Sequence, residues 1–499
     1  MKKNKDNNIM LNEARDTQLR MDAMKEVDKL KDKVSQDPFR LQFHIMPPVG
    51  LLNDPNGFIY FKGRYHLFYQ WNPFATDHGA KFWGHYTSRD LVHWEEQPIA
   101  LAPSDWFDKN GCYSGSAVEK EGKLILFYTG NVRDQEGNRE SYQCMAISED
   151  GINFDKKGPV VTVPTGYTAH FRDPKVWQGK DDYWYMVIGA QTESEHGCVV
   201  LYKSTDLEKW EFQGSLTGST QNQLGDFGYM WECPDLFHLG EKDVLLFSPQ
   251  GINAEGHLYN NIYQTGYLVG KFTGQQPSFT HGDFVELDRG FDFYAPQTTV
   301  DNQNRRLLFG WMGLPEENEP YHPTHSYHWI HAMTIPRELK LIDDKIYQIP
   351  VEELKHLRES IVEEGKSLTV TNQHVSVEGI VEHRVVEILL SNIENKTNNF
   401  SIAYGDSWKV KYNSQSKEIT FERRSLKEDK VETRTGIIHE LKSLHFYVDT
   451  SSVELFVNNG EEVFTSRVFD NLNDKSVQFE ADGTVVFDIE AWKLKKIFN

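Results

Sequence analysis

Short apolar segments separated by polar turns dominate the chain from residue 39 to about residue 337. The segments are rich in Tyr, Phe, Trp, Val and Ile, and the residues between them are mostly Gly, Asn, Asp and Ser. This pattern is typical of short β-strands joined by tight turns.

One of these strand-like segments occurs in five similar copies. The copies are 65–70 (YHLFYQ), 124–129 (LILFYT), 183–188 (YWYMVI), 244–248 (VLLFS) and 306–311 (RLLFGW). Three units also end alike, at 88–94 (SRDLVHW), 148–154 (SEDGINF) and 204–210 (STDLEKW). A repeat of about 60 residues with several strands per unit predicts a closed β-propeller. We therefore expect five blades in residues 38–340.

The start of the chain has a helical pattern. Between about residues 10 and 35, apolar side chains recur every three or four positions among many charged ones. These apolar positions are Leu19, Ala23, Val27, Leu30 and Val34. Asp37 precedes Pro38, and a residue before proline avoids the helical region, so the helix must end there. We expect residues 1–37 to form an N-terminal helical extension.

The composition changes twice after the expected propeller. Proline and charged residues around 336–357 predict a linker with one short helix, which we place at residues 341–362. Strand-like alternation returns in residues 363–499, where Asn458-Asn459-Gly460 between two apolar runs signals a hairpin. An antiparallel β-sandwich is expected here. The predicted fold class is therefore all-β, a five-bladed propeller followed by a sandwich.

Charge and cysteine content narrow the possible partners. The 499 residues include 53 basic and 74 acidic ones, a formal net charge of −21. Such a surface disfavours binding to nucleic acid or to an anionic membrane. Neither a membrane span nor a secretory signal is expected from the hydropathy pattern. The four cysteines form no CxxC pair, and reduced thiols fit a cytoplasmic protein. The oligomeric state does not follow from the sequence.

Carboxylates occur near the start of four of the five repeats, each close to a proline. The segments are Asn53-Asp54-Pro55, Arg172-Asp173-Pro174, Glu232-Cys233-Pro234 and 291–297 (FDFYAPQ). Taken singly, each is readily explained as a turn or a surface ion pair. A propeller, however, brings the first strands of its blades around one axis, and buried acids cost free energy unless a site uses them. We expect Asp54, Asp173 and Glu232 to meet in one funnel.

Converging carboxylates suit the hydrolysis of a glycosidic bond. One ionised carboxylate attacks the anomeric carbon, and a protonated one releases the leaving oxygen. Aromatic faces for sugar stacking can come from Trp71, Trp83, Tyr113, Tyr294 and Trp311, and hydroxyl contacts from Asn53, Gln70 and Arg172. This chemistry requires no metal ion and no cofactor, and its expected partner is a small sugar.

The motifs NDPNG, YQWNP, WGH, YSGSA, FRDPK, WECPD and FDFYAPQ occur in this order along the chain. In combination they resemble glycoside hydrolase family 32, which comprises invertases, fructanases and sucrose-6-phosphate hydrolases. The resemblance covers the chain from about residue 40 to residue 499, including 448–464 (VDTSSVELFVNNGEEVF) in the expected sandwich. The segments LLNDPNG and LAPSDWFDKNGCYSGSA are most similar to the bacterial cytoplasmic sucrose-6-phosphate hydrolases of that family.

The resemblance implies a retaining β-fructofuranosidase that hydrolyses sucrose 6-phosphate, sucrose or both. By motif position, Asp54 would be the nucleophile, Asp173 the transition-state stabiliser and Glu232 the acid/base. The fructose subsite would be lined by Asn53, Gln70, Trp83, Tyr113, Ser114, Arg172, Tyr294 and Trp311. Retention predicts roughly 5 Å between the two catalytic carboxyl groups.

The loop after YQWNP departs from the family pattern. Many members carry a tryptophan there, whereas this chain has ATDHGAK at 75–81. A histidine and a lysine can meet an anion, so His78 and Lys81 are expected to contact a substrate phosphate. The alternative is a solvated loop without a ligand.

Three other functions stay open at this point. A fructan exohydrolase or a fructosyltransferase would use the same three acids with different outer loops. A sugar-binding protein without activity would lack one of the acids, and all three are present. A five-bladed arabinan hydrolase would invert the anomeric configuration, with its carboxylates further apart.

Four histidines near the end of the expected propeller have a spacing that imitates a helical metal site. They are His322, His325, His328 and His331. Pro323 and the strand-like character of 328–331 (HWIH) argue against a helix, so no metal site is predicted.

Overall fold

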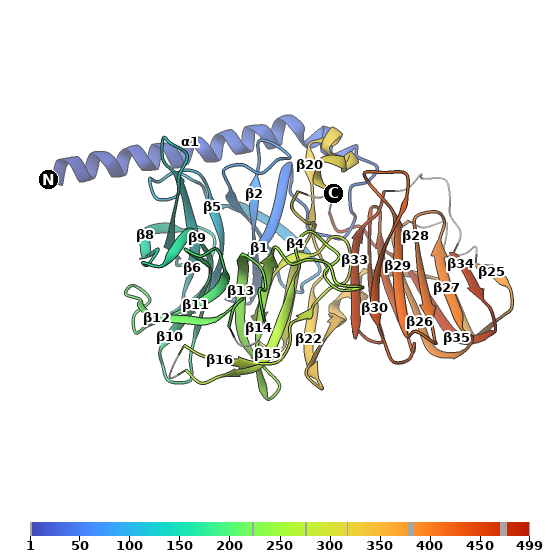
Figure 1. Ribbon diagram of the computed structural model, residues 1–499. Coiled ribbons are helices and arrows are strands. Elements are labelled where there is room, and N and C mark those ends of the chain that lie inside the picture. Colours follow the sequence, from blue (N-terminus) through green and yellow to red (C-terminus); the bar gives the residue numbers. More distant parts are fainter. Residues whose placement is uncertain are drawn as a thin grey trace.

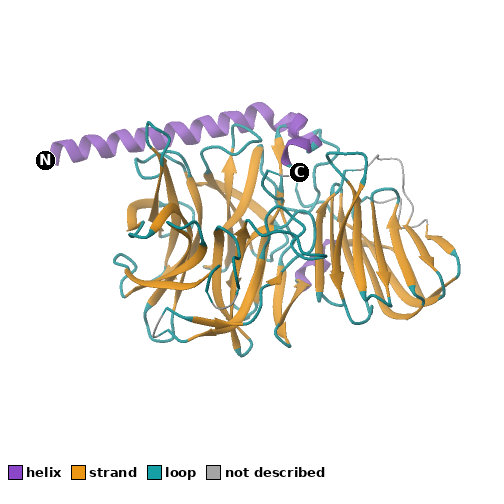
Figure 2. Cartoon of the chain, viewed as in Figure 1, coloured by secondary structure: helices purple, strands orange, loops and turns teal. Residues whose placement is uncertain are grey.

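The computed structural model describes residues 2–221, 224–274, 277–316, 318–377, 384–469 and 477–498, with side chains from Asn12 onwards. A long N-terminal helix is followed by a five-bladed β-propeller and then by a β-sandwich (Figure 1, Figure 2). The predicted fold class is therefore confirmed.

The first three blades are antiparallel sheets whose strands follow one another in chain order. Blade one contains β1 (Gly50–Phe61), β2 (Arg64–Asn72), β3 (Phe82–Ser88) and β4 (Trp94–Leu101). Blade two contains β5 (Cys112–Lys120), β6 (Lys123–Arg133), β7 (Arg139–Ser148) and β8 (Asp155–Thr162). Blade three contains β9 (Tyr167–Gln178), β10 (Trp184–Thr192), β11 (Gly197–Ser204) and β12 (Glu211–Gly218).

The last two blades are less regular, as their weaker repeat indicated. Blade four contains β13 (Met230–Leu239), β14 (Lys242–Gln250), β15 (Gly266–Phe272), β16 (Phe279–His281) and β17 (Val285–Glu286). Blade five contains β18 (Tyr294–Val300), β19 (Arg306–Met312), β21 (Ala332–Met333), β22 (Arg337–Ile342) and β23 (Lys345–Pro350).

The fifth sheet continues past residue 340, where we expected the propeller to end. Strand β22 pairs with β19, and β23 pairs with β22. The segment expected as a linker, 341–362, therefore consists of the end of blade five, the 3-10 helix η3 (Glu352–Leu357) and the start of the sandwich. The polar composition of this segment suggested a linker because β22 and β23, at the edge of a blade, alternate buried residues with partly or fully exposed ones.

The first strands of the blades form the inner ring of the propeller. Strand β1 packs against β5, β5 against β9, β9 against β13, β13 against β18, and β18 against β1. The short strand β20 (Trp329–Ile330) pairs parallel with β1 after blade five, so it joins the end of the propeller to its beginning. Before it lie the 3-10 helices η1 (Glu319–Tyr321) and η2 (Pro323–Tyr327). Of the strand expected at residues 328–331, only Trp329 and Ile330 are in a strand.

Helix α1 (Lys2–Ser35) crosses one face of the propeller (Figure 1). It begins earlier than the periodicity indicated. Its apolar stripe packs inward, since Ala23, Val27 and Val34 are buried. Arg20 donates to the backbone carbonyl groups of Ile99 and Ala100, which fixes the helix on blade one. Among the described residues no helix is both long enough and apolar enough to cross a membrane.

The C-terminal part consists of two six-stranded antiparallel sheets. One has the order β24 (Arg358–Thr371), β35 (Thr484–Leu494), β26 (Val386–Lys396), β31 (Leu444–Asp449), β32 (Ser452–Val457) and β33 (Glu462–Arg467). The other has the order β25 (His374–Val377), β34 (Val477–Ala481), β27 (Asn399–Tyr404), β28 (Trp408–Asn413), β29 (Glu418–Arg424) and β30 (Val431–Ile437). The predicted hairpin lies between β32 and β33, where Asn458, Asn459 and Gly460 all have positive φ.

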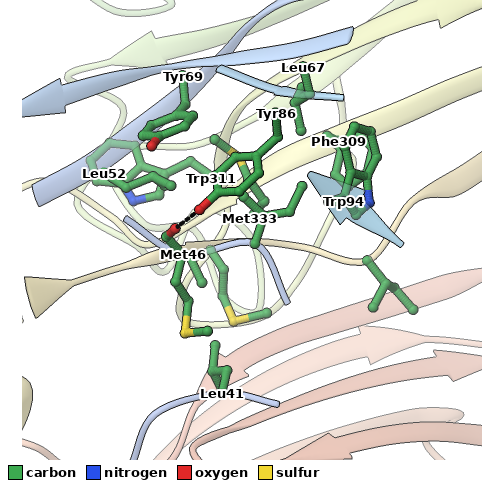
Figure 3. Close-up of a cluster of buried hydrophobic side chains, with 14 of the residues drawn as sticks. Leu41, Met46, Leu52, Leu67, Tyr69, Tyr86, Trp94, Phe309, Trp311 and Met333 are labelled. Atoms are coloured by element: carbon green, nitrogen blue, oxygen red, sulfur yellow. Dashed lines mark hydrogen bonds between the residues drawn. The ribbon is translucent and has the colours of Figure 1, made fainter. Parts of the chain in front are cut away.

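A continuous hydrophobic core joins the helix, the propeller and the sandwich. It includes Val27 of the helix, Tyr69 and Trp311 of the blades, and Tyr447 and Phe456 of the sandwich. Figure 3 shows its centre, where the Tyr86 hydroxyl donates to the Met46 carbonyl at 3.1 Å and the Trp94 ring meets the edge of Phe309. Because the core crosses the domain boundary, the two domains form one packed unit.

Buried ion pairs also cross from the propeller to the sandwich. Arg337 donates to Asp288 at 3.0 Å and to Glu454 at 2.5 Å, and all three side chains are fully buried. His44 lies between Glu454 and Asp449, at 2.9 and 2.8 Å. The three carboxylates thus share two basic partners, and such pairing lowers the cost of burying ions.

Candidate active site

The inner strand of each blade carries a β-bulge near the same end of the ring. The regular pairing shifts between Leu52 and Pro55 in β1 and between Glu232 and Asp235 in β13. Equivalent shifts occur in β5, β9 and β18. A bulge turns side chains away from the regular alternation and is common beside active sites. It also accommodates proline, which explains the repeated pairing of an acid with a proline.

The bulges bring the three expected acids together. The Sγ atom of Cys233 lies 3.7 Å from Oδ2 of Asp54 and 3.6 Å from Oδ2 of Asp173. Arg172 connects Asp173 to Glu232, with Nε 4.0 Å from Asp173 and Nη2 2.6 Å from Glu232. Asp173 and Cys233 have φ of 67° and 50°, conformations that non-glycine residues seldom adopt and that are typical of functional sites.

Polar side chains from blades one and two hold Asp54. Ser114 donates to Oδ2 at 2.5 Å, and Asn53 donates to Oδ1 at 3.2 Å. Asn53 also donates to Gln70 at 2.6 Å, and Gln70 donates to Ser114 at 2.6 Å, which closes a ring of four side chains. Burial raises the pKa of Asp54, while the bond from Ser114 opposes that effect. The ring fixes the direction in which the carboxylate points.

Glu232 accepts hydrogen bonds on both oxygens. Arg172 donates twice to Oε1, and Gln250 and Tyr294 donate to Oε2 at 2.8 and 2.7 Å. The Tyr294 hydroxyl also lies 3.4 Å from the carbonyl oxygen of Ser248. Since a hydroxyl both donates and accepts, Tyr294 can donate to Ser248 and accept from Glu232 when that acid is protonated. The site therefore accommodates Glu232 in both states.

The pKa of Asp173 is raised as well. Burial raises its pKa to about 7, Arg172 opposes the rise, and the charges of Glu232 and Asp54 add to it. The backbone N–H of Cys233 donates to Oδ2 at 3.0 Å. Burial and the neighbouring acids also raise the pKa of the Cys233 thiol well above its ordinary value, so Cys233 is a neutral, weak donor between the two aspartates.

The aromatic residues expected to stack on a sugar divide into two groups. Tyr294 lies at the acids, and Trp311 packs edge-on against it with ring centroids 6.1 Å apart. Tyr113 is partly exposed beside Ser114 on β5. Trp83 is fully buried, and its indole donates to the carbonyl oxygen of Tyr113, so it presents no surface to a sugar in this structure.

Trp83 instead packs between Phe68 and Tyr128, in the core between the first two blades. The indole of Trp71 is likewise buried and donates to the backbone of Val49. Trp71 follows Gln70 directly on β2, and sequence alone did not reveal which face of its strand each tryptophan would occupy.

The two residues expected to meet a phosphate lie beside Trp311 and Asp54. His78 packs edge-on against Trp311 with centroids 6.1 Å apart and contacts Glu319 at 3.0 Å. Lys81 is only 3% exposed, and its Nζ has no hydrogen-bond partner among the described residues. Burial lowers the pKa of Lys81 to about 7, against the effect of the Asp54 and Glu319 charges.

Sequence reasoning missed Gln250, Thr129 and Glu319. Gln250 ends β14 and reaches Glu232, and the Thr129 hydroxyl accepts from the backbone N–H of Asp173 at 2.9 Å. Glu319 is hydrogen-bonded to His78 and, at 2.8 Å, to His331. These residues lie outside the motif segments, so only the positions of the neighbouring blades identify them.

Of the four clustered histidines, His331 contacts Glu319 and His325 contacts Thr76 at 2.7 Å. His328 lies 3.1 Å from Lys33 of the helix. These three histidines thus contact different groups, and His322 packs edge-on against His331 with ring centroids 5.4 Å apart.

A propeller that brings three hydrogen-bonded carboxylates together suits the hydrolysis of a glycosidic bond, and comparison with known proteins agrees. The profile for the N-terminal domain of glycosyl hydrolases family 32 matches residues 44–350, and the profile for the C-terminal domain of that family matches residues 353–493. The chain belongs to glycoside hydrolase family 32.

Individual relatives span nearly the whole chain. The sucrose-6-phosphate hydrolase of Bacillus subtilis is 52% identical over 96% of this chain and 99% of its own. That of Salmonella typhimurium is 45% identical over 86% and 88%.

Two solved structures are similar over almost their entire length. The β-fructofuranosidase of Bombyx mori has a TM-score of 0.83 at 35% identity, over 96% of this chain and 98% of its own. The sucrose-6-phosphate hydrolase of Lactobacillus gasseri has a TM-score of 0.83 at 30% identity, over 95% and 97%.

Proposed function

We propose that this protein is a retaining β-fructofuranosidase that hydrolyses sucrose 6-phosphate and sucrose at the fructosyl bond. The observation that carries the proposal is the single hydrogen-bonded cluster of Asp54, Asp173 and Glu232 at the propeller axis. Full-length similarity to sucrose-6-phosphate hydrolases supports the substrate.

In this mechanism Asp54 attacks C2 of the fructosyl unit while Glu232 gives its proton to the departing glucosyl oxygen. The covalent fructosyl ester on Asp54 then reacts with water, from which Glu232 takes a proton. Positive charge develops on the sugar in both steps, and Asp173 stabilises it when ionised. Ser114 and Asn53 hold Asp54 in the direction of attack.

The phosphate contact is proposed for Lys81 and His78. A buried ammonium group without a hydrogen-bond partner among the described residues is costly, and a phosphate oxygen would satisfy it. The negative charge of Glu319 would repel a phosphate bound beside Lys81. Hydrogen bonds to His78 and His331 already engage that carboxylate. Those bonds hold the pKa of Glu319 well below its usual range even though burial works the other way.

We also propose a cytoplasmic location. All four cysteines are free thiols, and three of them are buried. Free thiols are typical of a reducing compartment.

Stereochemistry tests the proposal. With sucrose as donor and methanol added to the reaction, the covalent intermediate is expected to yield methyl β-fructofuranoside, identified by NMR. Formation of the α anomer would mean single-step inversion and would remove Asp54 from the nucleophile role. Release of fructose from neither sucrose nor sucrose 6-phosphate would refute the substrate assignment.

A further inference from the structure

A large groove opens beneath blades three, four and five, away from the sugar-stacking residues. Its volume is about 1390 Å³, more than the roughly 300–1,000 Å³ typical of pockets that hold small molecules. Lys175, Trp177, Asp235, Phe272 and Arg306 are among its lining residues. None of the three catalytic acids lines it.

The groove lies at the opposite end of the same inner strands. Asp173 and Lys175 are two residues apart on β9, and Glu232 and Asp235 are three residues apart on β13. A small central cavity is lined by Asp173 as well as by Lys175 and Asp235, and the latter two also line the groove. The Lys175–Asp235 pair, at 3.0 Å, therefore separates the catalytic acids from the groove.

At the deep end of the groove, two basic side chains face one carboxylate. Lys175 and Arg306 are two cations, and Asp235 is the carboxylate between them. Arg306 donates to the Thr298 hydroxyl at 3.3 Å, but it forms no ion pair with any described residue, and its Nε has no hydrogen-bond partner there. Burial lowers the pKa of both Lys175 and Arg306, against the effect of Asp235.

Two of the outer lysines are paired with carboxylates. Lys203 contacts Asp181 at 3.3 Å, and Lys242 contacts Asp344 at 2.6 Å. Arg306 has no such ion pair among the described residues, and it lies where water is partly excluded, so an anion there is worth most.

Aromatic rings form one wall of the groove. Trp177 stacks on Tyr185 with centroids 5.6 Å apart, and Phe272 meets the edges of both rings. Trp177 is only partly buried. Aromatic rings beside a cationic end are suited to a ligand with an apolar ring face and an anionic group.

We propose that this groove binds a phosphorylated sugar, with the phosphate against Arg306 and Lys175 and the sugar ring against Trp177. The site is separate from the catalytic acids, and its existence does not depend on the proposed reaction. Direct binding tests it independently of activity.

The test is calorimetric titration of the full-length Asp54→Asn variant, whose changed nucleophile lies outside the groove. The probes are glucose 6-phosphate, inorganic phosphate and glucose. Glucose 6-phosphate is expected to bind, and glucose is not. Arg306→Met should weaken glucose 6-phosphate at least about tenfold, because a charge-assisted hydrogen bond is lost. Lys271→Met, at an exposed lysine of the same groove, should change it less than about twofold.

A second variant tests the site independently, in case Arg306→Met does not fold. Thr280→Glu places a negative charge on an exposed rim position and leaves the buried pair intact, so it should also weaken binding severalfold. Affinity that neither variant changes would place the ligand elsewhere and overturn the proposal, as would no binding at about 10 mM. Equal affinities for phosphate and glucose 6-phosphate would overturn the role of the sugar ring.

Discussion

Arg172 donates two hydrogen bonds to one oxygen of Glu232, from Nε at 3.0 Å and from Nη2 at 2.6 Å. The same guanidinium lies 4.0 Å from Asp173. One cation thus positions two of the three acids, and its planar fork is what makes this possible. We therefore expect the geometry of the proposed site to depend on Arg172.

Arg172→Lys is therefore expected to lower kcat/KM for sucrose about 100-fold, because an ammonium group cannot form the paired contact. Initial rates with the purified variant measure this. Arg133→Lys is the matched control, since the exposed Arg133 donates to the backbone carbonyl of Gly137 at 3.1 Å and the variant should retain most activity. A lysine at 172 that supports rates within threefold of wild type would contradict the positioning role.

Glu232→Gln removes the proposed proton donor and leaves the proposed nucleophile, Asp54, in place. We expect kcat for sucrose to fall by about 10²–10⁴, while an aryl β-fructofuranoside with a good leaving group loses far less in its first step. Pre-steady-state kinetics on both substrates compare the two losses. Equal losses would count against Glu232 as the acid.

Asp173→Asn should stabilise the protein at alkaline pH while abolishing activity. The folded-state pKa of Asp173 is raised to about 7, so ionisation costs stability as pH rises from about 4 to about 7. The neutral amide avoids this cost. The variant's gain in unfolding free energy should be up to about 3 kcal/mol larger at pH 8 than at pH 5. Urea unfolding at both pH values tests this, and a gain independent of pH would contradict it.

Lys81→Met is expected to lower kcat/KM for sucrose 6-phosphate at least about tenfold relative to its effect on sucrose. The comparison between substrates matters because Lys81 also acts on the charge of Asp54. Since its pKa is about 7, the wild-type preference for the phosphorylated sugar should decline between pH 6 and pH 8. If kcat/KM fell equally for both substrates, Lys81 would act only through its charge on Asp54 and not on the phosphate.

His44→Gln should destabilise the contact between propeller and sandwich by about 3–5 kcal/mol, because it leaves Asp449 and Glu454 without their shared partner. Burial lowers the pKa of His44, but the two acids outweigh it and the net shift is upward. The stabilisation is therefore complete below about pH 6.5 and is lost as pH rises through the folded-state pKa. Thermal unfolding at pH 6 and pH 9 should show a larger deficit of the variant at pH 6. An equal deficit would mean that His44 is neutral in the fold.

The sequence by itself predicted the blades, the sandwich and the convergence of Asp54, Asp173 and Glu232. The strand repeat and the acid–proline segments are local patterns, and local patterns report which residues begin an inner strand. The hairpin at Asn458-Asn459-Gly460 followed for the same reason, because its backbone conformation is set by those residues themselves.

Only the tertiary structure decided which side chains face the funnel. Trp83 and Tyr113 looked equivalent as sugar contacts, yet the packing of blade one against blade two buries Trp83 and leaves Tyr113 partly exposed. Gln250 and Glu319 join the site from segments without any motif. Their positions, and the unmatched charge of Arg306, depend on how neighbouring blades pack, a long-range relationship that no local pattern encodes.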